Sequence, residues 1–326
     1  MNLQEIKLSS QTQNLLCCPS CQSKLKVNNH KFECINNQCQ SNFPIIDGIP
    51  VLIDNDASVF STQDYLQQGK DTTLKTKSKL ERRLIDLVPS INFNLKGKTN
   101  YQNFTELILK QNKEPKILII GGSVVGQGIK SLMSTSAVEI VESDVVLGDN
   151  ISVICDAHEI PFEDNSFDGV VVQAVLEHVV DPYTCVDEIF RILKDDGLVY
   201  SETPFMQQVH LGKYDFTRFT HLGHRRLFRK FEEVSSGPVC GPGMALAWTY
   251  QYFLLSFVRS ETARNLVKVF ARLTSFWLKY FDYYLINKAG SFDSASAYFF
   301  LGKKSNLLLS DKELLSLYKG NQQSSF

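Results

Sequence analysis

The sequence predicts an α/β protein whose central sheet is mostly parallel, preceded by a small cysteine-rich unit. Short apolar runs between residues 116 and 172 have the composition of buried parallel strands. Glycines or acidic residues follow most of these runs. Five of the eight cysteines lie before residue 40, a clustering that indicates metal binding rather than a disulfide framework. Together these observations predict two folded units of unequal size.

The first predicted strand, Lys116–Ile120, breaks into a glycine-rich loop with Gly121, Gly122, Ser123 and Gly126. Glycines let the backbone approach a ligand closely, and we expect the next helix to begin beside this loop. Ligands of open α/β sheets bind outside the carboxyl ends of the strands. A pocket is therefore expected at this edge.

Two further predicted strands lead to acidic residues. The run Ala137–Val141 leads to Asp144, whose carboxylate can accept hydrogen bonds from both hydroxyls of a ribose. Glu142 is a rival for that role. The run Ile151–Cys155 leads to Asp156, which can accept a hydrogen bond from an adenine amino group. The pattern predicts an adenosine site.

The remaining strands are expected at Phe167–Val172, Gly197–Thr203, Phe231–Ser235 and Ser296–Leu301. We expect a helix to start within Gln173–His178. The long segment before the last strand is expected to be a helical insertion.

Four motifs in this region point to a known family. They are Asp156-Ala-His-Glu-Ile-Pro-Phe162, Ser166-Phe-Asp168, Glu177-His178 and Glu188-Ile-Phe-Arg-Ile-Leu-Lys-Asp-Asp-Gly197. Together they resemble the class I S-adenosylmethionine-dependent methyltransferases, in particular the type 11-like branch. The resemblance covers about Lys116 to Pro204. It implies a Rossmann-like sheet with an antiparallel last strand, and S-adenosylmethionine as cofactor. The implied cofactor contacts are Gly121, Gly122, Ser123, Gly126, Asp144, Asp156, Ala157 and Gln173.

Two positions depart from the family pattern. Ile119 stands where the family usually has an acid that orients the methionine amino group, and the glycine loop reads Gly-Gly-Ser-Val-Val-Gly. A non-catalytic binding module on the same fold is therefore an alternative. A glycine loop with an acid about 20 residues on also suits a dinucleotide enzyme. The motifs at Asp156 and Glu177-His178 favour the methyltransferase.

The cysteine-rich unit contains two knuckles with a predicted hairpin between them and a strand, turn and strand at residues 43–53. Four thiolates at this spacing fit a closed tetrahedral zinc site, and the unit resembles the zinc ribbon that precedes some bacterial methyltransferases. Cys17 is an alternative ligand and His30 a weaker one. We expect this ribbon to lie outside the sheet that forms the pocket. The predicted ligands are Cys18, Cys21, Cys34 and Cys39.

The loop after the fifth strand carries the candidate catalytic residues. Its run His210-x-x-x-Tyr-Asp-Phe-x-Arg-Phe-Thr220 resembles methyltransferases of surface-glycan biosynthesis. His210 is the candidate base, because an imidazole can take up a proton near neutral pH. Asp215 and Arg218 are candidates to hold a sugar or a phosphate. The alternative is that these residues only hold the loop to itself, and His178 is expected to be structural.

The insertion, residues 244–286, begins with an apolar stretch and continues as a helix with two faces. Such a helix can lie in a membrane interface. It can equally pack in the core with a wet basic face, or form a dimer contact, and we favour this second reading. The basic stripe is Arg264, Lys268, Arg272, Ser275 and Lys279, opposite Leu266, Val267, Phe270, Leu273, Trp277, Leu278, Phe281 and Leu285.

Composition favours a cytoplasmic enzyme, with peripheral contact to the inner membrane face as an option. The chain has 326 residues, 43% hydrophobic content and a net charge of −1, with no apolar run that could cross a bilayer and no leader-like start. The basic residues between 70 and 83 are expected to be a solvated linker face. The expected domains are a ribbon at 1–56, a helical linker at 57–112, a methyltransferase domain at 113–304 with an insertion at 240–294, and a tail at 305–326.

The predicted reaction is methyl transfer to an oxygen of a glycan or lipid-linked metabolite. The main rival is an RNA base methyltransferase, since a zinc ribbon precedes the domain there too. The near-neutral charge argues against RNA. The chain also lacks an Asn/Asp-Pro-Pro-Tyr-like element, because Gln173-Ala-Val-Leu176 stands at that place.

Overall fold

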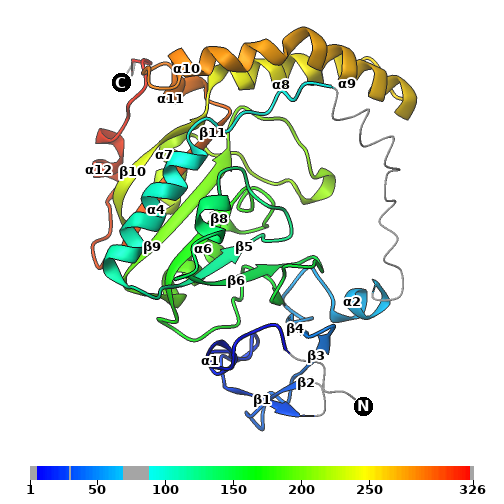
Figure 1. Ribbon diagram of the computed structural model, residues 1–326, viewed down its shortest axis with the longest axis vertical. Helices are drawn as coiled ribbons and strands as arrows, with labels where there is room; N and C mark the ends of the chain where they lie inside the picture. Colours follow the sequence, from blue (N-terminus) through cyan, green and yellow to red (C-terminus); the bar gives the residue numbers. More distant parts are fainter. Residues whose placement is uncertain (1–5, 29–30, 69–87, 324–326) are drawn as a thin grey trace.

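The central sheet has the predicted architecture, as the computed structural model shows for residues 6–28, 31–68 and 88–323 (Figure 1). The part of the sheet that lies in the expected methyltransferase domain runs β7-β6-β5-β8-β9-β11-β10. The strands from β7 to β9 are parallel, whereas β11 is antiparallel to both β9 and β10, so the prediction of an antiparallel last strand is confirmed. The strands are β5 Lys116–Ile120, β6 Glu139–Asp144, β7 Val153–Cys155, β8 Phe167–Gln173, β9 Leu193–Pro204, β10 Phe231–Cys240 and β11 Ala297–Lys304.

The two faces of this sheet carry separate apolar cores, because side chains alternate along each strand. On one face, Leu118 and Val170 pack with α6, Pro182–Ile192. On the other face, Ile117 and Val171 pack with α4, Gly97–Gln111. Three fully buried side chains of α4 join this second core: Tyr101, Phe104 and Ile108. Part of the segment expected to be a linker therefore covers the sheet, and the domain bounds stay a prediction.

The cysteine-rich unit forms the predicted hairpin and strand pair. β1 Leu25–Asn28 pairs with β2 Lys31–Cys34, and β3 Asn42–Ile46 pairs with β4 Ile49–Leu52. Positive φ angles of 50° at Asp47 and 78° at Gly48 make the tight turn between β3 and β4.

The expected separation of the ribbon from the main sheet is wrong. β4 pairs in parallel with β7, with Val51 opposite Ile154 and Leu52 opposite Cys155. Val51 and Leu52 have no exposed surface, since apolar residues of both units cover them. One continuous order of strands therefore runs from β1 of the ribbon to β10.

Two helix expectations near the pocket are also wrong. Gln173–His178 is not helical, because β8 runs to Gln173 and α6 begins at Pro182, with Asp181 as its N-cap. The glycine loop does not lead directly into a helix either, since α5 is a single turn, Lys130–Met133. The pocket edge is thus built mainly from turns. Further short helices are α1 Ser10–Gln13, α2 Thr62–Gln68, α7 His221–Leu227 and α12 Asp311–Ser316.

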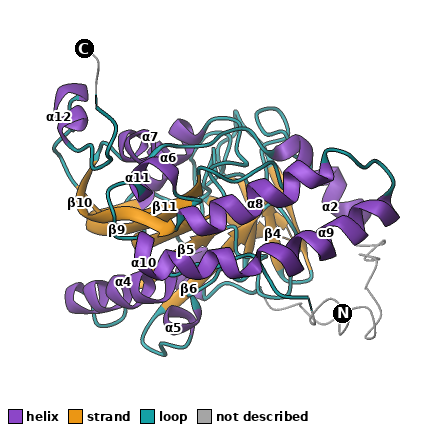
Figure 2. Cartoon of the chain, turned by 90° about the horizontal axis from the view of Figure 1, so that it is seen from above, coloured by secondary structure: helices purple, strands orange, loops and turns teal. Residues whose placement is uncertain are grey.

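The helical insertion lies between β10 and β11, as predicted, and α8 and α9 lie side by side (Figure 2). The small residues Ala271 and Ser275 are buried on α9, whereas Leu266 is 69% and Phe270 55% exposed. Lys279 is buried and donates a hydrogen bond from Nζ to the carbonyl oxygen of Ser90. The interpretation with a core-packed apolar face and a wet basic face is therefore wrong. The insertion contains α8 Pro242–Leu255, α9 Glu261–Ser275, η2 Phe276–Phe281, α10 Asp282–Leu285 and α11 Ser291–Ser294.

Over the described ranges, none of the helices combines the length and the apolar character that crossing a bilayer requires.

Candidate functional site

A pocket opens at the carboxyl ends of β5, β6 and β7, where the sequence predicts the cofactor. Of the predicted contacts, Gly121, Asp144, Asp156 and Ala157 line it. The lining also contains residues from three other segments, namely Val59 and Phe60, Val175 to Val180 in part, and Tyr214 and Phe216. The structure thus brings the ends of the first three predicted strands to one site.

Asp144 lies at the rim of this pocket with a fixed carboxylate. Its Oδ2 accepts from the backbone N–H of Ser123 at 2.9 Å, and its Oδ1 accepts from the N–H groups of Val145 and Val146. Glu142, the rival, is buried beneath Gly122 and does not line the pocket. Burial raises the pKa of Glu142. The contacts therefore favour Asp144 as the acid that faces a ribose.

Asp156 is 4% exposed and already holds partners of its own. One carboxylate oxygen accepts from both the backbone N–H and Nδ1 of His158, at 3.0 and 2.6 Å, and the other accepts from Oγ of Ser58 at 2.5 Å. Burial alone would raise the pKa of Asp156, but these hydrogen bonds from His158 and Ser58 lower it. The carboxylate is thus held ionised and can accept a hydrogen bond.

Ser58 belongs to a strap, residues 58–60, that the sequence did not assign to the site. The ring of Phe60 stacks on that of Tyr214 with centroids 5.9 Å apart. Beneath this strap about 80 Å³ of the pocket is free, less than the roughly 300 Å³ or more of typical small-molecule sites. Val59 and Phe60 of the strap thus help to limit the space at this site.

Gln173 lies behind the glycine loop rather than in the pocket lining. Its Oε1 accepts from the hydroxyl of Tyr101 at 2.9 Å, and its Nε2 donates to Glu202 at 2.7 Å. A Cβ atom at Gly126 would come within 1.7 Å of this Oε1, so the loop depends on glycine there. Ile119 is 4% exposed and packs in the core on the α4 face. Glu202 was not predicted from the sequence, and burial raises the pKa of its carboxyl to about 7.

A second cavity of about 480 Å³ lies on the other side of the loop that follows β9. Tyr252 of α8 lines it, so the insertion contributes to this cavity. Phe216 belongs to the linings of both cavities. The other residues that line the second cavity are Gln207, Gln208, Val209, Asp215, Thr217 and Arg218.

Arg218 and Asp215 bind each other within this loop. The guanidinium forms a two-armed ion pair with Asp215 and donates its other N–H groups to the carbonyl oxygens of Gln207, Gln208 and Thr217. Burial raises the pKa of Asp215, but hydrogen bonds from Arg218 and the N–H of His210 bring it down to about 2. All five donors of Arg218 are used. A role in binding a sugar or phosphate stays a prediction, and the contacts favour the alternative that the pair holds the loop.

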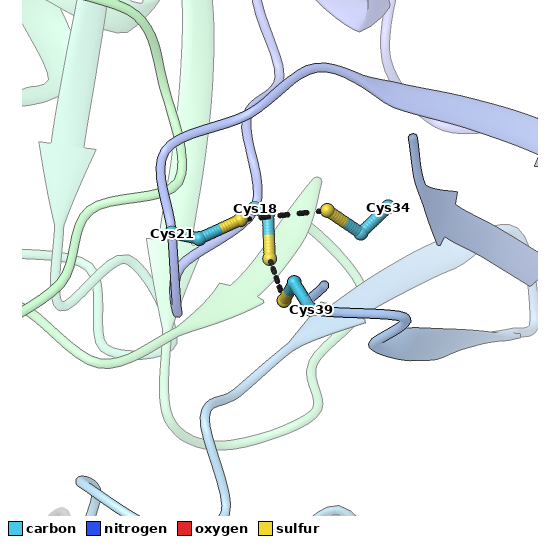
Figure 3. A group of neighbouring side chains, drawn as sticks. All are labelled: Cys18, Cys21, Cys34 and Cys39. Carbon is cyan, nitrogen blue, oxygen red and sulfur yellow. Dashed lines mark hydrogen bonds between the residues drawn. The ribbon is translucent and has the colours of Figure 1, made fainter. Parts of the chain in front are cut away.

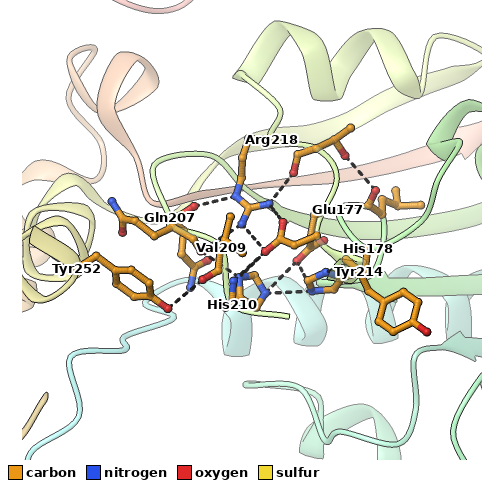
Figure 4. Close-up of polar contacts among 12 residues, drawn as sticks. Glu177, His178, Gln207, Val209, His210, Tyr214, Arg218 and Tyr252 are labelled. Carbon is orange, nitrogen blue, oxygen red and sulfur yellow. Dashed lines mark hydrogen bonds and ion pairs between the residues drawn. The ribbon is translucent and has the colours of Figure 1, made fainter. Parts of the chain in front are cut away.

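His210 meets two residues that the family motif supplies, Glu177 and His178 (Figure 4). The Nε2 atoms of His178 and His210 are 3.0 Å apart, and Oε1 of Glu177 lies 3.7 and 3.9 Å from them. Burial raises the pKa of Glu177 to about 8 and lowers that of His178. This cluster lies between the two cavities. His178 lines the first cavity, and Asp215, which binds the backbone N–H of His210, lines the second.

The four predicted ligand cysteines converge in the ribbon (Figure 3). The Sγ atoms of Cys18 and Cys39 are 3.7 Å apart, and those of Cys21 and Cys34 are 3.5 Å apart. Tetrahedral zinc with bonds of about 2.3 Å requires sulfur atoms about 3.8 Å apart. The alternative ligand Cys17 instead contacts Oε1 of Gln22. His30 lies outside the described residues.

Comparison with known proteins gives different matches for the two units. A family model described as a methyltransferase domain matches residues 120–201. A demethylmenaquinone methyltransferase from Clavibacter sepedonicus is 43% identical over 47 residues, 14% of this chain and 19% of that protein. The chain thus spans about a fifth of that relative. A UPF0434 protein from Pseudomonas savastanoi pv. phaseolicola is 34% identical over 55 residues, 17% of this chain and 90% of that protein.

Solved structures with a similar fold share little sequence with this chain. A putative sarcosine dimethylglycine methyltransferase from Galdieria sulphuraria aligns with a TM-score of 0.44 and 18% identity, over 65% of this chain and 86% of that chain. A complex of the Haloferax volcanii Trm112 methyltransferase activator with a putative methyltransferase gives a TM-score of 0.38 and 16% identity, over 67% of this chain and 99% of the matched chain.

Proposed function

This chain belongs to the class I S-adenosylmethionine-dependent methyltransferases, with a UPF0434-like segment in its N-terminal unit, and we propose that it methylates an oxygen of a glycan or lipid-linked metabolite. The observation that carries this proposal is the sharing of Phe216 by the two cavities. An adenosine held by Asp144 and Asp156 would thus end beside a separate space for an acceptor. Alignment of acceptor, methyl group and sulfur supplies most of the rate of such a displacement.

The acceptor cavity suits a hydroxyl-bearing molecule. In the reaction, the acceptor oxygen bonds to the methyl carbon while the carbon–sulfur bond breaks, and the hydroxyl proton passes to a base. His210 supports this role because its backbone N–H donates to Asp215, which lines the cavity, and 27% of its side chain is exposed. The exposed apolar face of α9 belongs to the insertion that also provides Tyr252, which supports an acceptor with a lipid part.

Structural zinc in the ribbon is part of the proposal. The four thiolates fill every position of a tetrahedral ion, so this site would stabilise the fold rather than bind substrate.

Transfer of a radioactive methyl group from S-adenosylmethionine tests the proposed reaction. The protein is incubated with envelope glycolipid, soluble nucleotide sugars or total RNA, and Asp156→Ala serves as the inactive control. We expect label in a carbohydrate-containing fraction. Label confined to ribonuclease-sensitive material would support the RNA alternative, and cofactor binding without transfer to any fraction would support the non-catalytic module.

A further inference from the structure

The cluster of Glu177, His178 and His210 has the ligand spacing of a metal site. Nitrogen and oxygen ligands about 2.0 to 2.2 Å from a zinc-sized ion lie about 3.0 Å apart at right angles and about 3.4 Å apart in a tetrahedron. The three separations here are 3.0, 3.7 and 3.9 Å. An ion would fit among these atoms after shifts of a few tenths of an ångström.

The outer ring nitrogens of both histidines face hydrogen-bond acceptors. Nδ1 of His178 lies 2.9 Å from the carbonyl oxygen of Tyr214, and Nδ1 of His210 lies 3.3 Å from that of Gln208 and 3.5 Å from Oδ2 of Asp215. Because these partners only accept, both neutral rings carry their proton on Nδ1. Metal-ligating histidines usually have this arrangement.

The inner ring nitrogens are consequently both bare. Two nitrogen lone pairs that face each other across 3.0 Å repel, unless a cation lies between them or one ring takes up a second proton. A cation held by both nitrogens would remove this repulsion.

Glu177 supplies the second reason for a cation at this place. Its side chain is fully buried, and neither carboxylate oxygen has a hydrogen-bond partner among the described residues. A buried polar group without a partner is costly, and an ionised one more so. The backbone fixes the residue, since the carbonyl oxygen of Glu177 accepts from the N–H of Phe216 at 2.8 Å.

We propose that Glu177, His178 and His210 form a second metal site, separate from the four cysteines, that binds a divalent transition-metal ion such as Zn²⁺. Two imidazoles and one carboxylate suit such an ion better than Mg²⁺. Three protein ligands leave at least one position open, unlike the closed ribbon site. An acceptor hydroxyl in that position would lose its proton more readily, to solvent, because His210 would then be a metal ligand and no longer the base. This role rests on the proposed function, whereas metal binding itself does not.

Titration of the full-length protein with Co²⁺ and Zn²⁺, without S-adenosylmethionine or acceptor, tests the proposal. Co²⁺ at the cysteines gives an intense sulfur-to-metal charge-transfer band, whereas Co²⁺ at the second site gives only weak visible bands. We expect two ions per chain in the wild type. Glu177→Gln and His210→Ala should each keep the sulfur band and weaken the second site by more than the roughly 10- to 100-fold that loss of an outer partner costs.

The metal titration has two controls. Glu163→Gln alters a partly exposed glutamate that pairs with Lys24, and it should still bind two ions. Affinity for S-adenosylmethionine, measured without added metal, shows that Glu177→Gln is folded. One ion per chain in the wild type with the ribbon loaded, or two ions in Glu177→Gln and His210→Ala, would overturn the site. Failure of methyl transfer alone would bear only on the proposed function.

Discussion

The hydroxyl of Ser58 donates a hydrogen bond to Oδ2 of Asp156 across 2.5 Å, so the chain that leaves the ribbon reaches the predicted adenine site. Only the seven residues 53–59 separate Leu52, the last residue of β4, from Phe60, which lines the pocket. Order in the ribbon and access to the pocket are therefore connected through a short covalent path.

This connection predicts that loss of zinc weakens cofactor binding. Cys21→Ser and Cys34→Ser should lose the ribbon ion and also lower the affinity for S-adenosylmethionine, because β4 would no longer be held against β7. Elemental analysis and calorimetry measure the two effects. Cys17→Ser, whose thiol contacts Gln22, should change neither. Unchanged cofactor affinity in zinc-free protein would show that the strap acts independently of the ribbon.

Asp144→Ala and Asp156→Ala should each weaken binding of S-adenosylmethionine. Hydrogen bonds to a charged acceptor contribute about 1.5 to 3 kcal/mol, which corresponds to roughly 10- to 100-fold in Kd. Calorimetric titration gives the affinity, and circular dichroism checks the fold. Asp195→Ala, an exposed acid near the opposite end of the sheet, is the matched control. Wild-type affinity in both pocket variants would contradict the assigned cofactor site.

The burial of Glu202 predicts that the free energy of unfolding decreases as the pH rises. Burial raises the pKa of this carboxyl from 4.5 to about 7, so the folded state binds its proton more tightly than the unfolded chain. The stabilisation is present below pH 4.5 and is lost as the pH rises to about 7, and its size is on the order of 3 kcal/mol.

Glu202→Gln should remove this component. The amide oxygen can accept from Nε2 of Gln173 and Nδ2 of Asn94, as Oε2 of the acid does. Urea unfolding at pH 5 and pH 8 gives the free energies of unfolding. Between pH 5 and pH 8, the free energy of unfolding should decrease more for the wild type than for Glu202→Gln. An equal decrease in both proteins would mean that Glu202 is ionised throughout.

The exposed apolar stripe of α9 predicts binding to a lipid surface. Replacing Leu266, Phe270 and Leu273 with serine should abolish flotation with liposomes, because more than half of each side chain is exposed and free to enter the interface. The melting temperature should stay near the wild-type value. Ala271→Leu is the contrasting variant, since it enlarges a buried residue and should lower the melting temperature. Loss of self-association instead of flotation would identify a dimer contact.

Local patterns in the sequence were sufficient for much of the fold and of the nucleoside site. Gly121 and Asp156 directly follow a strand and Asp144 ends one, so the alignment of parallel strands brings them together. The convergence of the four cysteines was also predictable, because the spacing of zinc ligands along the chain is a local pattern.

Features that depend on contacts between distant segments could not be predicted in this way. The sequence does not show that Val51 pairs with Ile154, or that Ser58 reaches Asp156. The predicted orientation of α9 was wrong, because this helix buries the small residues Ala271 and Ser275 and leaves Leu266 and Phe270 exposed. The facing ring nitrogens of His178 and His210 follow from the fold of a loop without regular structure.

The parallel pairing of β4 with β7 has a consequence for the protein without its ribbon. β7 is the outermost strand of the methyltransferase part of the sheet, and β4 covers its free side. Without residues 1–56, β7 would present unpaired N–H and C=O groups along an apolar edge, which is a template for a strand of another molecule. We therefore expect protein without the ribbon to aggregate through this edge of the sheet.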